Sequence, residues 1–288
     1  MKYFFKRLLR ILPDKLYIQL QYFYHFHKFA NLKNPQTFNE KLQWLKLHDR
    51  NPLYTTMVDK YKVKDYVANI IGKEYIIPTI GIYNNVEEID FNKLPKQFVL
   101  KCNHNSGGIV ICKDKSKLNK HAAITKLSKA LKNNGYWYGR EWPYKNVPRK
   151  IIAEQYMEDR TQKGLKDYKL MCFNGKVKCS FVCSERFSKT GLKVTFYDNN
   201  WKVMPFERHY PKSKIPIEKP INYSEMVELA EKLSKNIPFV RVDFYSVNGK
   251  TYFGELTFFP GSGFEEFTPF EWDKKLGNLL KINYEQYK

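Results

Sequence analysis

The chain has 288 residues, of which 43% are hydrophobic and 16% aromatic, and this composition excludes a disordered tail protein. A chain of this length forms one large domain or two closely packed ones, with enough buried surface for a hydrophobic core. Its 50 Lys and Arg residues against 29 Asp and Glu residues give a net charge of +21, so the surface favours phosphates, acidic polymers or anionic lipid headgroups.

The first residues are basic and contain no clean apolar stretch of the kind found in a secretory signal. The longest uncharged stretch, residues 16–27, is too short to span a bilayer. On a helix, the first cations would line one face and the first apolar side chains the opposite one (Lys2, Lys6 and Arg10; Phe5, Leu8, Leu9 and Leu12). Such a helix either packs on the protein core, which we favour, or lies on a membrane surface.

The five cysteines include no Cys-x-x-Cys pair, which argues against a zinc ribbon or a redox motif. An odd number of cysteines without a secretory signal is typical of a reducing cytosol. We therefore expect a cytoplasmic protein, and a peripheral contact with the inner face of the membrane stays open.

The first 70 residues are expected to be mostly helical. Apolar residues at helical spacing predict one helix over 38–47 and another over 54–67. Asp59 and Lys60 lie in the middle of the second helix. Further along the chain, the same pattern predicts three more helices (116–134, 225–235 and 269–280).

From residue 75 onward, short runs of β-branched and aromatic residues predict β-strands. These runs are 75–83, 97–101, 109–112, 149–157, 167–173, 176–183, 240–245 and 251–257. Two of the connections are Asn-Gly pairs, at 174–175 and 248–249, which favour tight type I′ hairpin turns. Because helices and antiparallel hairpins interleave, we expect an α+β fold with antiparallel sheets.

Two carboxylates fall on the last predicted hairpin, among otherwise apolar residues. With the Asn-Gly turn between the strands, Asp243 lies opposite residue 254, so Glu255 is one step further along. A buried carboxylate is costly unless it is paired or binds a metal. Asp243, Glu255 and the hydroxyl of Thr257 therefore form a candidate site for a hard cation such as Mg²⁺. The alternative is a solvated face with a salt bridge to Arg241.

The turn after the second predicted strand is a candidate phosphate site. Lys101 ends the strand, and a turn through Ser106, Gly107 and Gly108 could surround phosphate oxygens with backbone N–H groups. The alternative is an ordinary turn, because Ser-Gly-Gly occurs in many of those. A loop histidine such as His104 is expected to be solvated rather than catalytic.

The order of these elements resembles the ATP-grasp superfamily, and the details resemble its TupA-like branch, which is associated with teichuronopeptide and cell-surface polysaccharide synthesis. The similarity covers about residues 35–280. It rests on Thr37-Phe-Asn-Glu-Lys41, Phe98-Val-Leu-Lys-Cys-Asn-His-Asn-Ser-Gly-Gly108, Asp167-Tyr-Lys169, Gly254-Glu-Leu-Thr257 and Trp272-Asp-Lys-Lys-Leu276.

The resemblance implies an ATP-grasp fold, in which two subdomains built on antiparallel sheets hold ATP between them. Here it implies a mostly helical N-terminal region at 1–95, a small subdomain with the phosphate loop at 96–157, and a C-terminal subdomain with the metal site at 158–288.

The resemblance also implies how the phosphates of ATP are bound. Lys60 and Lys101 match the two lysines that meet the α- and β-phosphates. Ser106, Gly107 and Gly108 match the loop that closes over the β- and γ-phosphates.

Residues 154–157 match the hinge that reads adenine in this superfamily. Glu154 or Gln155 would lie near the exocyclic amine, and the backbone N–H of Met157 near N1. Glu158 or Asp159 is the carboxylate implied for the ribose.

The reaction centre is implied by four further matches. Lys169 matches a cation that faces the γ-phosphate or the acceptor, and Arg241 matches the arginine that steadies the acyl phosphate. Asp243 and Glu255 match the Mg²⁺ ligands. The usual third metal ligand is Asn, and here Thr257 takes its place, which offers one hydroxyl oxygen.

These roles imply an ADP-forming carboxylate–amine ligase. The γ-phosphoryl group of ATP would activate a carboxylate as an acyl phosphate, and an amine would then displace phosphate to form an amide. Phosphoryl transfer depends mainly on positioning and charge neutralisation, which Mg²⁺ and the cations would supply. The implied acceptor is a cell-surface polysaccharide or its lipid-linked precursor, and the net charge suits an acidic sugar.

Two other classes of function compete with a ligase. A metal-dependent glycosyltransferase usually carries a close Asp-x-Asp pair, and the chain has none, whereas a sugar kinase would use the same ATP site and stays open. A basic module for nucleic acid is not expected, because the charge is spread along the chain without an arginine-rich block.

Residues 180–222 are long, basic and irregular, and we expect them to shape the acceptor site. Ser262, in the Pro-Gly-Ser-Gly turn after the last strand, is the expected substrate contact.

Overall fold

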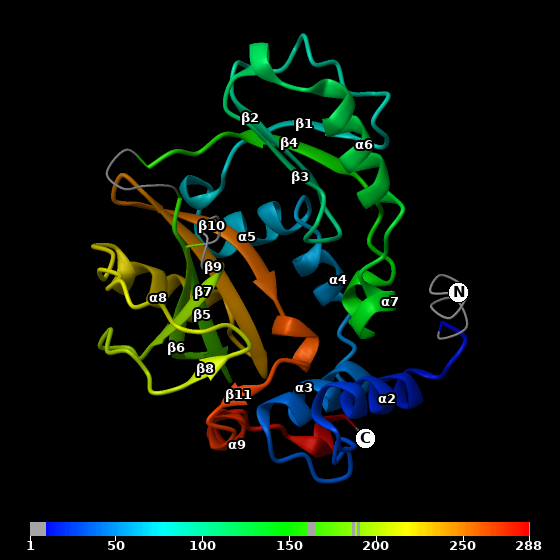
Figure 1. Cartoon of the computed structure of the whole chain (residues 1–288), viewed down its shortest axis with the longest axis vertical. Coiled ribbons are helices and arrows are strands. Elements are labelled where there is room, and N and C mark those ends of the chain that lie inside the picture. Colours follow the sequence, from blue (N-terminus) through cyan, green and yellow to red (C-terminus); the bar gives the residue numbers. More distant parts are fainter. Residues whose placement is uncertain (1–9, 160–164, 186–187, 189–190, 288) are drawn as a thin grey trace.

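The structure, a computed structural model, describes residues 10–159, 165–185, 188 and 191–287. Within these residues lie antiparallel sheets of four, five and two strands. Figure 1 shows the four-stranded sheet at one end of the molecule, the five-stranded sheet in the middle and a group of helices at the opposite end. The expected α+β fold with antiparallel sheets is confirmed.

The N-terminal part is helical, as predicted. Its helices are α2 (Asp14–Phe26), α3 (Phe38–His48), α4 (Leu53–Val58) and α5 (Val63–Ile71), and a 3-10 turn, η1 (Lys73–Tyr75), follows. At the start of α3, the Thr37 hydroxyl accepts from the N–H of Glu40, and the Glu40 carboxylate accepts from the N–H of Thr37. The predicted amphipathic pattern of the first residues falls mainly on 1–9, outside the described residues.

The single helix predicted over 54–67 is wrong, because the chain breaks between α4 and α5. The Asp59 carboxylate accepts from the N–H of Tyr61 at 2.9 Å and from the side-chain amide of Asn103 at 2.9 Å. A side-chain acceptor that takes backbone N–H groups in this way competes with helix continuation. The break leaves Lys60 in the turn between the two helices.

The four-stranded sheet has the order β1–β4–β2–β3. Its strands are β1 (Thr79–Tyr83), β2 (Phe98–Cys102), β3 (Ile109–Cys112) and β4 (Ile151–Gln155), and α6 (Lys120–Leu131) packs against β2 and β3. β2 and β3 form the predicted hairpin. Because β1 precedes residue 96, this sheet takes one strand from the region predicted as N-terminal.

The five-stranded sheet has the order β10–β9–β5–β6–β7. Its strands are β5 (Asp167–Phe173), β6 (Lys176–Ser184), β7 (Lys193–Tyr197), β9 (Phe239–Val247) and β10 (Lys250–Thr257). Both Asn-Gly turns occur as predicted: Asn174, Gly175, Asn248 and Gly249 have φ values of 49°, 78°, 50° and 79°, as a type I′ turn requires.

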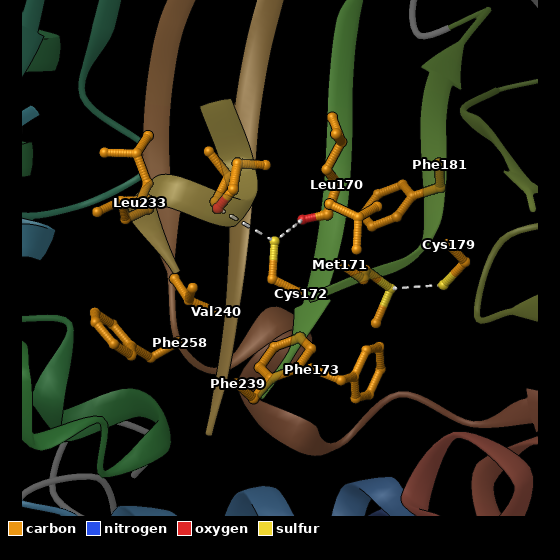
Figure 2. Close-up of a cluster of buried hydrophobic side chains, with 14 of the residues drawn as sticks. Leu170, Met171, Cys172, Phe173, Cys179, Phe181, Leu233, Phe239, Val240 and Phe258 are labelled. Carbon is orange, nitrogen blue, oxygen red and sulfur yellow. Dashed lines mark hydrogen bonds between the residues drawn. The ribbon is translucent and has the colours of Figure 1, made fainter. Parts of the chain in front are cut away.

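The two faces of this sheet differ in chemistry. One face packs on α8 (Tyr223–Leu233) and is apolar; Figure 2 shows Cys172 in this core, with its Sγ 3.8 Å from the carbonyl oxygens of Leu170 and Ala230. The opposite face carries Phe239 at one end of β9, followed by Arg241 and Asp243. That face therefore changes from apolar to charged along the strand.

The remaining elements lie between the strands and helices given above or at the C-terminal end of the chain. They are η2 (Lys115–Lys117), α7 (Tyr136–Gly139), η3 (Trp142–Tyr144), β8 (Glu207–Arg208), η4 (Pro260–Gly263), β11 (Phe267–Thr268), α9 (Glu271–Leu279) and η5 (Tyr284–Tyr287). β7 and β8 lie in the segment 180–222, for which strands were not predicted beyond residue 183. In the described part of the chain, no helix combines the length and the apolar character that crossing a membrane requires.

The end of α3 contains a buried carboxylate that should make stability depend on pH. Asp49 is 8% exposed, its carboxylate accepts from the Tyr54 hydroxyl at 3.1 Å, and burial raises its pKa from 3.8 to about 6. A carboxyl group with a raised folded-state pKa stabilises the fold at low pH and loses that contribution as the pH rises through the folded-state value.

We therefore expect the free energy of unfolding of the wild-type protein to fall, relative to Asp49→Asn, by on the order of 2 to 3 kcal/mol between about pH 4 and pH 6.5. Urea unfolding of both proteins at several pH values measures this difference. Glu228→Gln, which changes an exposed carboxylate of α8, is the control and should give no such pH-dependent difference. A constant difference between wild type and Asp49→Asn would contradict the prediction.

Candidate active site

The two predicted metal carboxylates face each other across β9 and β10. A register shift between Phe253 and Glu255 pairs Glu255 directly with Asp243, whereas the turn geometry alone placed residue 254 there. A Cβ atom on Gly254 would lie 3.0 Å from the carbonyl oxygen of Asp243, so glycine suits this crowded bulge. The bulge brings both carboxylates side by side on one face of the sheet.

Arg241 joins the two carboxylates. Its Nε and Nη2 each lie 2.6 Å from an oxygen of Asp243, and Nη2 also lies 3.0 Å from Oε1 of Glu255. Two carboxylate oxygens therefore converge on a single nitrogen. Asp243 is only 1% exposed, so the alternative of a solvated face is wrong, although the salt bridge expected with it is present.

Two lysines approach the same pair from opposite sides. Lys169 pairs with Asp243 in the sheet, and its Nζ bonds the Asp243 carboxylate. Lys60 Nζ lies 3.3 Å from Oε2 of Glu255, and the Lys60 N–H donates to the carbonyl oxygen of Asn103 at 3.0 Å. Because Asn103 follows β2, Lys60 links the charged face of the large sheet to the loop of the small one.

Burial and the neighbouring cations act in opposite directions on these acids. Burial raises the pKa of Asp243 to about 6, although Arg241 and Lys169 favour its charged form. Burial also opposes ionisation of Glu255, but the neighbouring cations, Lys60 first, hold its pKa well below the ordinary value. Burial lowers the pKa of Lys169, but the neighbouring carboxylates raise it by more. The net result is a pKa of about 12. Glu255 and Lys169 are therefore both charged at neutral pH.

A second charged cluster lies on the four-stranded sheet. The Glu154 carboxylate is buried, and its two oxygens lie 2.6 Å from Lys64 Nζ and 2.6 Å from Lys101 Nζ. Burial opposes its ionisation, but the two lysines lower the pKa of Glu154. Lys101 was predicted as an ATP-binding residue; Lys64 of α5 was not, because it is one of many lysines and its partner lies on a distant strand.

The loop between β2 and β3 starts with buried side chains. The Asn103 side-chain amide donates to Asp59 and to the carbonyl oxygen of Pro148, and His104 Nε2 lies 2.9 Å from the carbonyl oxygen of Asn133. His104 is 2% exposed, so the expectation of a solvated histidine is wrong. These contacts fix the base of the loop next to the turn that carries Lys60.

The predicted phosphate residues occupy the rest of this loop. Ser106 and Gly107 are exposed at its tip. Gly108 is buried: a Cβ atom there would lie 2.6 Å from the Cβ of Ala130, and its N–H donates to the Asn105 side chain at 3.2 Å. Gly108 thus lets the hairpin pack on α6, and Ser106 and Gly107 are the accessible members of the predicted set.

The predicted adenine hinge continues from β4. Gln155 and Glu158 are exposed and Met157 is half-buried, while Asp159 is buried, so Glu158 is the more accessible of the two carboxylates considered for the ribose. The Glu154 side chain is held by its two lysines. Contacts of these residues with adenine and ribose stay predictions.

Ser262 lies in the tight turn η4, where it and its two glycine neighbours have positive φ. Its hydroxyl donates to the Glu141 carboxylate, and its carbonyl oxygen accepts from Lys46 Nζ at 2.6 Å. Burial lowers the pKa of Lys46 to about 7 and raises that of Glu141. The turn is therefore held by a buried lysine of α3 and a half-buried glutamate after α7, neither of which the sequence singled out.

Arg208 adds a cation that was also not predicted. It is 6% exposed, its Nε lies 2.9 Å from Oε2 of Glu265, and its guanidinium carbon lies 5.0 Å from the centre of the Phe181 ring. The guanidinium carbon of Arg241 lies 5.7 Å from the same ring, so both arginines flank this part of the sheet. Among the described residues, the buried Nη1 of Arg208 has no hydrogen-bond partner, and such a donor is costly to leave unsatisfied.

The residues present fit a hard divalent cation. No cluster of three or more His, Cys, Asp and Glu side chains suited to a metal occurs in the part of the chain that the structure describes. Asp243 and Glu255 nevertheless converge, and Thr257, which pairs with Arg241 in the sheet, adds a hydroxyl on the same face. Carboxylate oxygens combined with phosphate oxygens of a nucleotide are the ligands that Mg²⁺ prefers.

Several solved structures match the chain at low sequence identity. Among solved structures, the chain is similar to D-cycloserine synthetase DcsG, with a TM-score of 0.46, 14% identity and coverage of 82% of this chain and 72% of that one. It is also similar to D-alanine–D-alanine ligase from Bacillus anthracis complexed with ATP, with a TM-score of 0.43, 15% identity and coverage of 78% and 63%. The ATP-grasp ligase PsnB, complexed with Mg and ADP, matches with a TM-score of 0.43, 12% identity and coverage of 82% and 61%.

The chain thus spans about three-fifths of the length of the D-alanine–D-alanine ligase and of PsnB. No curated protein sequence matches it. A protein-family model described as TupA-like ATPgrasp matches residues 40–281, which is most of the chain. The protein therefore belongs to the TupA-like ATP-grasp family.

Proposed function

We propose that this protein is an ATP-dependent, ADP-forming ligase that joins a carboxylate to an amine. Family membership suggests an ATP-dependent ligase, and the geometry supports this reaction. The observation that carries the proposal is the opposed pair Asp243 and Glu255, bridged by Arg241 and flanked by two lysines. Clustered cations beside two convergent carboxylates suit a phosphoryl-transfer site.

The residues divide into groups with separate tasks. Lys60 and Lys101 would bind the α- and β-phosphates, and the exposed loop tip at Ser106 and Gly107 would cover the β- and γ-phosphates. Glu154 orients Lys101, because it holds that lysine in an ion pair. The hinge residues that would bind the nucleoside are Gln155, Met157 and Glu158.

At the reaction centre, Lys169 and Arg241 would stabilise the negative charge on the γ-phosphoryl group and on the acyl phosphate. Asp243, Glu255 and Thr257 would hold Mg²⁺, which when bound neutralises phosphate charge. An amine would then attack the acyl carbon, and inorganic phosphate would leave as the amide forms. Ser262 would contact the substrate from the turn η4. Nothing in this scheme needs a protein nucleophile.

The acceptor that we propose is anionic, in keeping with a cell-surface polysaccharide or its lipid-linked precursor. Arg208 supports this choice, because it places beside Arg241 a buried guanidinium with one nitrogen that has no hydrogen-bond partner among the described residues. The net charge of +21 favours the approach of such an acceptor. A cytoplasmic site, where ATP is available, fits the same proposal.

The test is a screen for products. The full-length protein would be incubated with ATP, Mg²⁺, amino acids and uronic acid-containing sugars, and ADP release would be followed together with product masses. A ligase gives a product whose mass is that of both substrates less one water. A phosphate ester on an acceptor hydroxyl, formed without any amine, would favour the kinase alternative and would overturn the proposal, as would a lack of ADP release with every substrate pair.

Arg208→Met is expected to raise the KM for the acceptor found in that screen roughly tenfold to a hundredfold, because a hydrogen bond to a charged group is lost. The KM for ATP should change little. Steady-state kinetics measure both constants. Lys212→Met, at an exposed lysine in the same segment, is the matched control and should behave as wild type. An unchanged KM for an acidic acceptor in Arg208→Met would rule out this contact.

A further inference from the structure

Helix α2 is apolar on two faces, and the described residues cover only one of them. Tyr17, Ile18 and Tyr22 are buried against the protein. On the other side, four large apolar side chains follow helical i, i+4, i+7 and i+8 spacing and are exposed by 48%, 43%, 46% and 74%: Leu16, Leu20, Phe23 and Tyr24. They form a continuous exposed row along the helix.

The row continues beyond both ends of α2. Phe29 is 62% exposed and its ring stacks on that of Phe23, with centroids 5.1 Å apart, while Ile11 precedes the helix and is 77% exposed. We call these six residues the α2 stripe: Ile11, Leu16, Leu20, Phe23, Tyr24 and Phe29. A contiguous exposed apolar surface of this kind marks an interaction site.

The chain segment that carries the α2 stripe is cationic. Arg10, Lys15, Lys28 and Lys33 are exposed in the same stretch of chain. The single acidic residue between positions 10 and 33 is Asp14, and its carboxylate is held by Arg50 at 3.0 Å and by the Tyr136 hydroxyl. The α2 stripe therefore lies in a segment that has four exposed cations and no exposed acidic residue.

We propose that the α2 stripe docks on an anionic membrane surface, with its apolar side chains at the level of the acyl chains and the bordering cations among the headgroups. Leucine and phenylalanine beside lysine and arginine are the composition of a helix that lies in the membrane interface. A second copy of this chain fits less well, because a symmetric contact through this face would bring two sets of cations together.

The packing of α2 gives this docking a consequence for the site. Tyr22 and Ala30 form one buried cluster with Phe264, and the ring of His25 stacks on that of Phe264 at 5.3 Å. Phe264 directly follows the turn η4 that contains Ser262. If the proposed function holds, membrane docking through α2 therefore holds the acceptor end of the site close to the bilayer, as a lipid-linked acceptor requires.

Vesicle flotation tests the docking without any substrate. The full-length protein is mixed with phosphatidylcholine vesicles that contain or lack phosphatidylglycerol. We expect wild type to float with the anionic vesicles, and Leu20→Gln/Phe23→Gln to lose roughly tenfold or more of its bound fraction. Ile221→Gln is the matched control, because Ile221 is 92% exposed but lies outside the stripe, and it should float as wild type does.

The contribution of charge and the oligomeric state are tested separately. Lys15→Gln/Lys28→Gln should weaken flotation with anionic vesicles, and added salt should do the same. The docking proposal is overturned if wild type does not float, or if the Leu20/Phe23 variant floats equally well. It is also overturned if ultracentrifugation shows a dimer that this variant loses. Nucleotide binding without vesicles should be unchanged in all these variants, so failure of the docking and failure of the proposed ligase activity are distinguished.

Discussion

Glu255→Gln is expected to lower ADP formation by about a hundredfold to a thousandfold while the protein stays folded. Its carboxylate faces Asp243 and lies within 3.3 Å of Lys60 Nζ and 3.0 Å of Arg241 Nη2. Glutamine keeps the shape but removes the negative charge that would bind Mg²⁺, and losing such preorganised electrostatic stabilisation costs several kcal/mol in the transition state. Fold retention is expected because the Glu255 side chain is 31% exposed and Arg241 keeps its two hydrogen bonds to Asp243.

Calorimetric titration of ATP with and without Mg²⁺ separates this effect from misfolding. Wild type should bind ATP more tightly with Mg²⁺, and Glu255→Gln should lose most of that difference. Glu266→Gln removes an exposed carboxylate from the nearby chain and should bind as wild type does. If Glu255→Gln kept the full Mg²⁺ dependence, the assignment of the metal site would be wrong.

The hairpins were predictable because their determinants are local. Asn-Gly at 174–175 and 248–249 adopts the positive φ values that a type I′ turn requires, and alternating apolar residues define the strands on either side. The register of the last hairpin was not predictable in the same way. The bulge at Gly254 shifts Glu255 by one position, and nothing in the turn sequence requires a bulge there.

The residues that sequence reasoning missed act through contacts between distant segments. Lys64 acquires its role from Glu154 on β4, Arg208 from Phe181 and Glu265, and the buried state of His104 from α6 and the residues after it. In a chain with 50 Lys and Arg residues, a functional lysine has no local signal that separates it from the solvated ones. The residue pattern and the resemblance to a family singled out Lys101, Asp243 and Glu255, and the structure shows which side chains they contact.

Glu154→Gln is expected to destabilise the protein by about 3 to 5 kcal/mol. Its carboxylate is 5% exposed and is the shared partner of Lys64 and Lys101. Removing one charge of a buried ionic cluster leaves the opposite charges without compensation, which costs far more than an exposed salt bridge contributes. Urea unfolding measures the loss, and ATP titration should show weaker binding, because Lys101 would no longer be held in place.

A double-mutant cycle identifies the cause. Lys64→Met removes one of the two lysines that lose their carboxylate partner in Glu154→Gln. The free energy lost by Glu154→Gln/Lys64→Met should therefore be smaller than the sum of the losses in the two single variants. A smaller loss is expected in the control Glu231→Gln, whose partner Lys176 is 65% exposed. Strict additivity of Glu154→Gln and Lys64→Met would mean that the cluster does not act as a unit.

The stability difference between wild type and Glu154→Gln should depend on pH in a definite direction. The two lysines lower the pKa of Glu154 from its ordinary 4.5, and an acid with a lowered folded-state pKa stabilises the fold above the unfolded-state value. The difference in unfolding free energy between wild type and Glu154→Gln should therefore be largest and constant above about pH 5.5, and it should shrink as the pH falls below 4.5. This is opposite to the behaviour expected for Asp49, whose pKa is raised because burial acts on it without an ion pair of comparable strength. Measured on one protein, the two profiles would separate a carboxylate whose charged form is stabilised by lysines from one whose ionisation is opposed by burial.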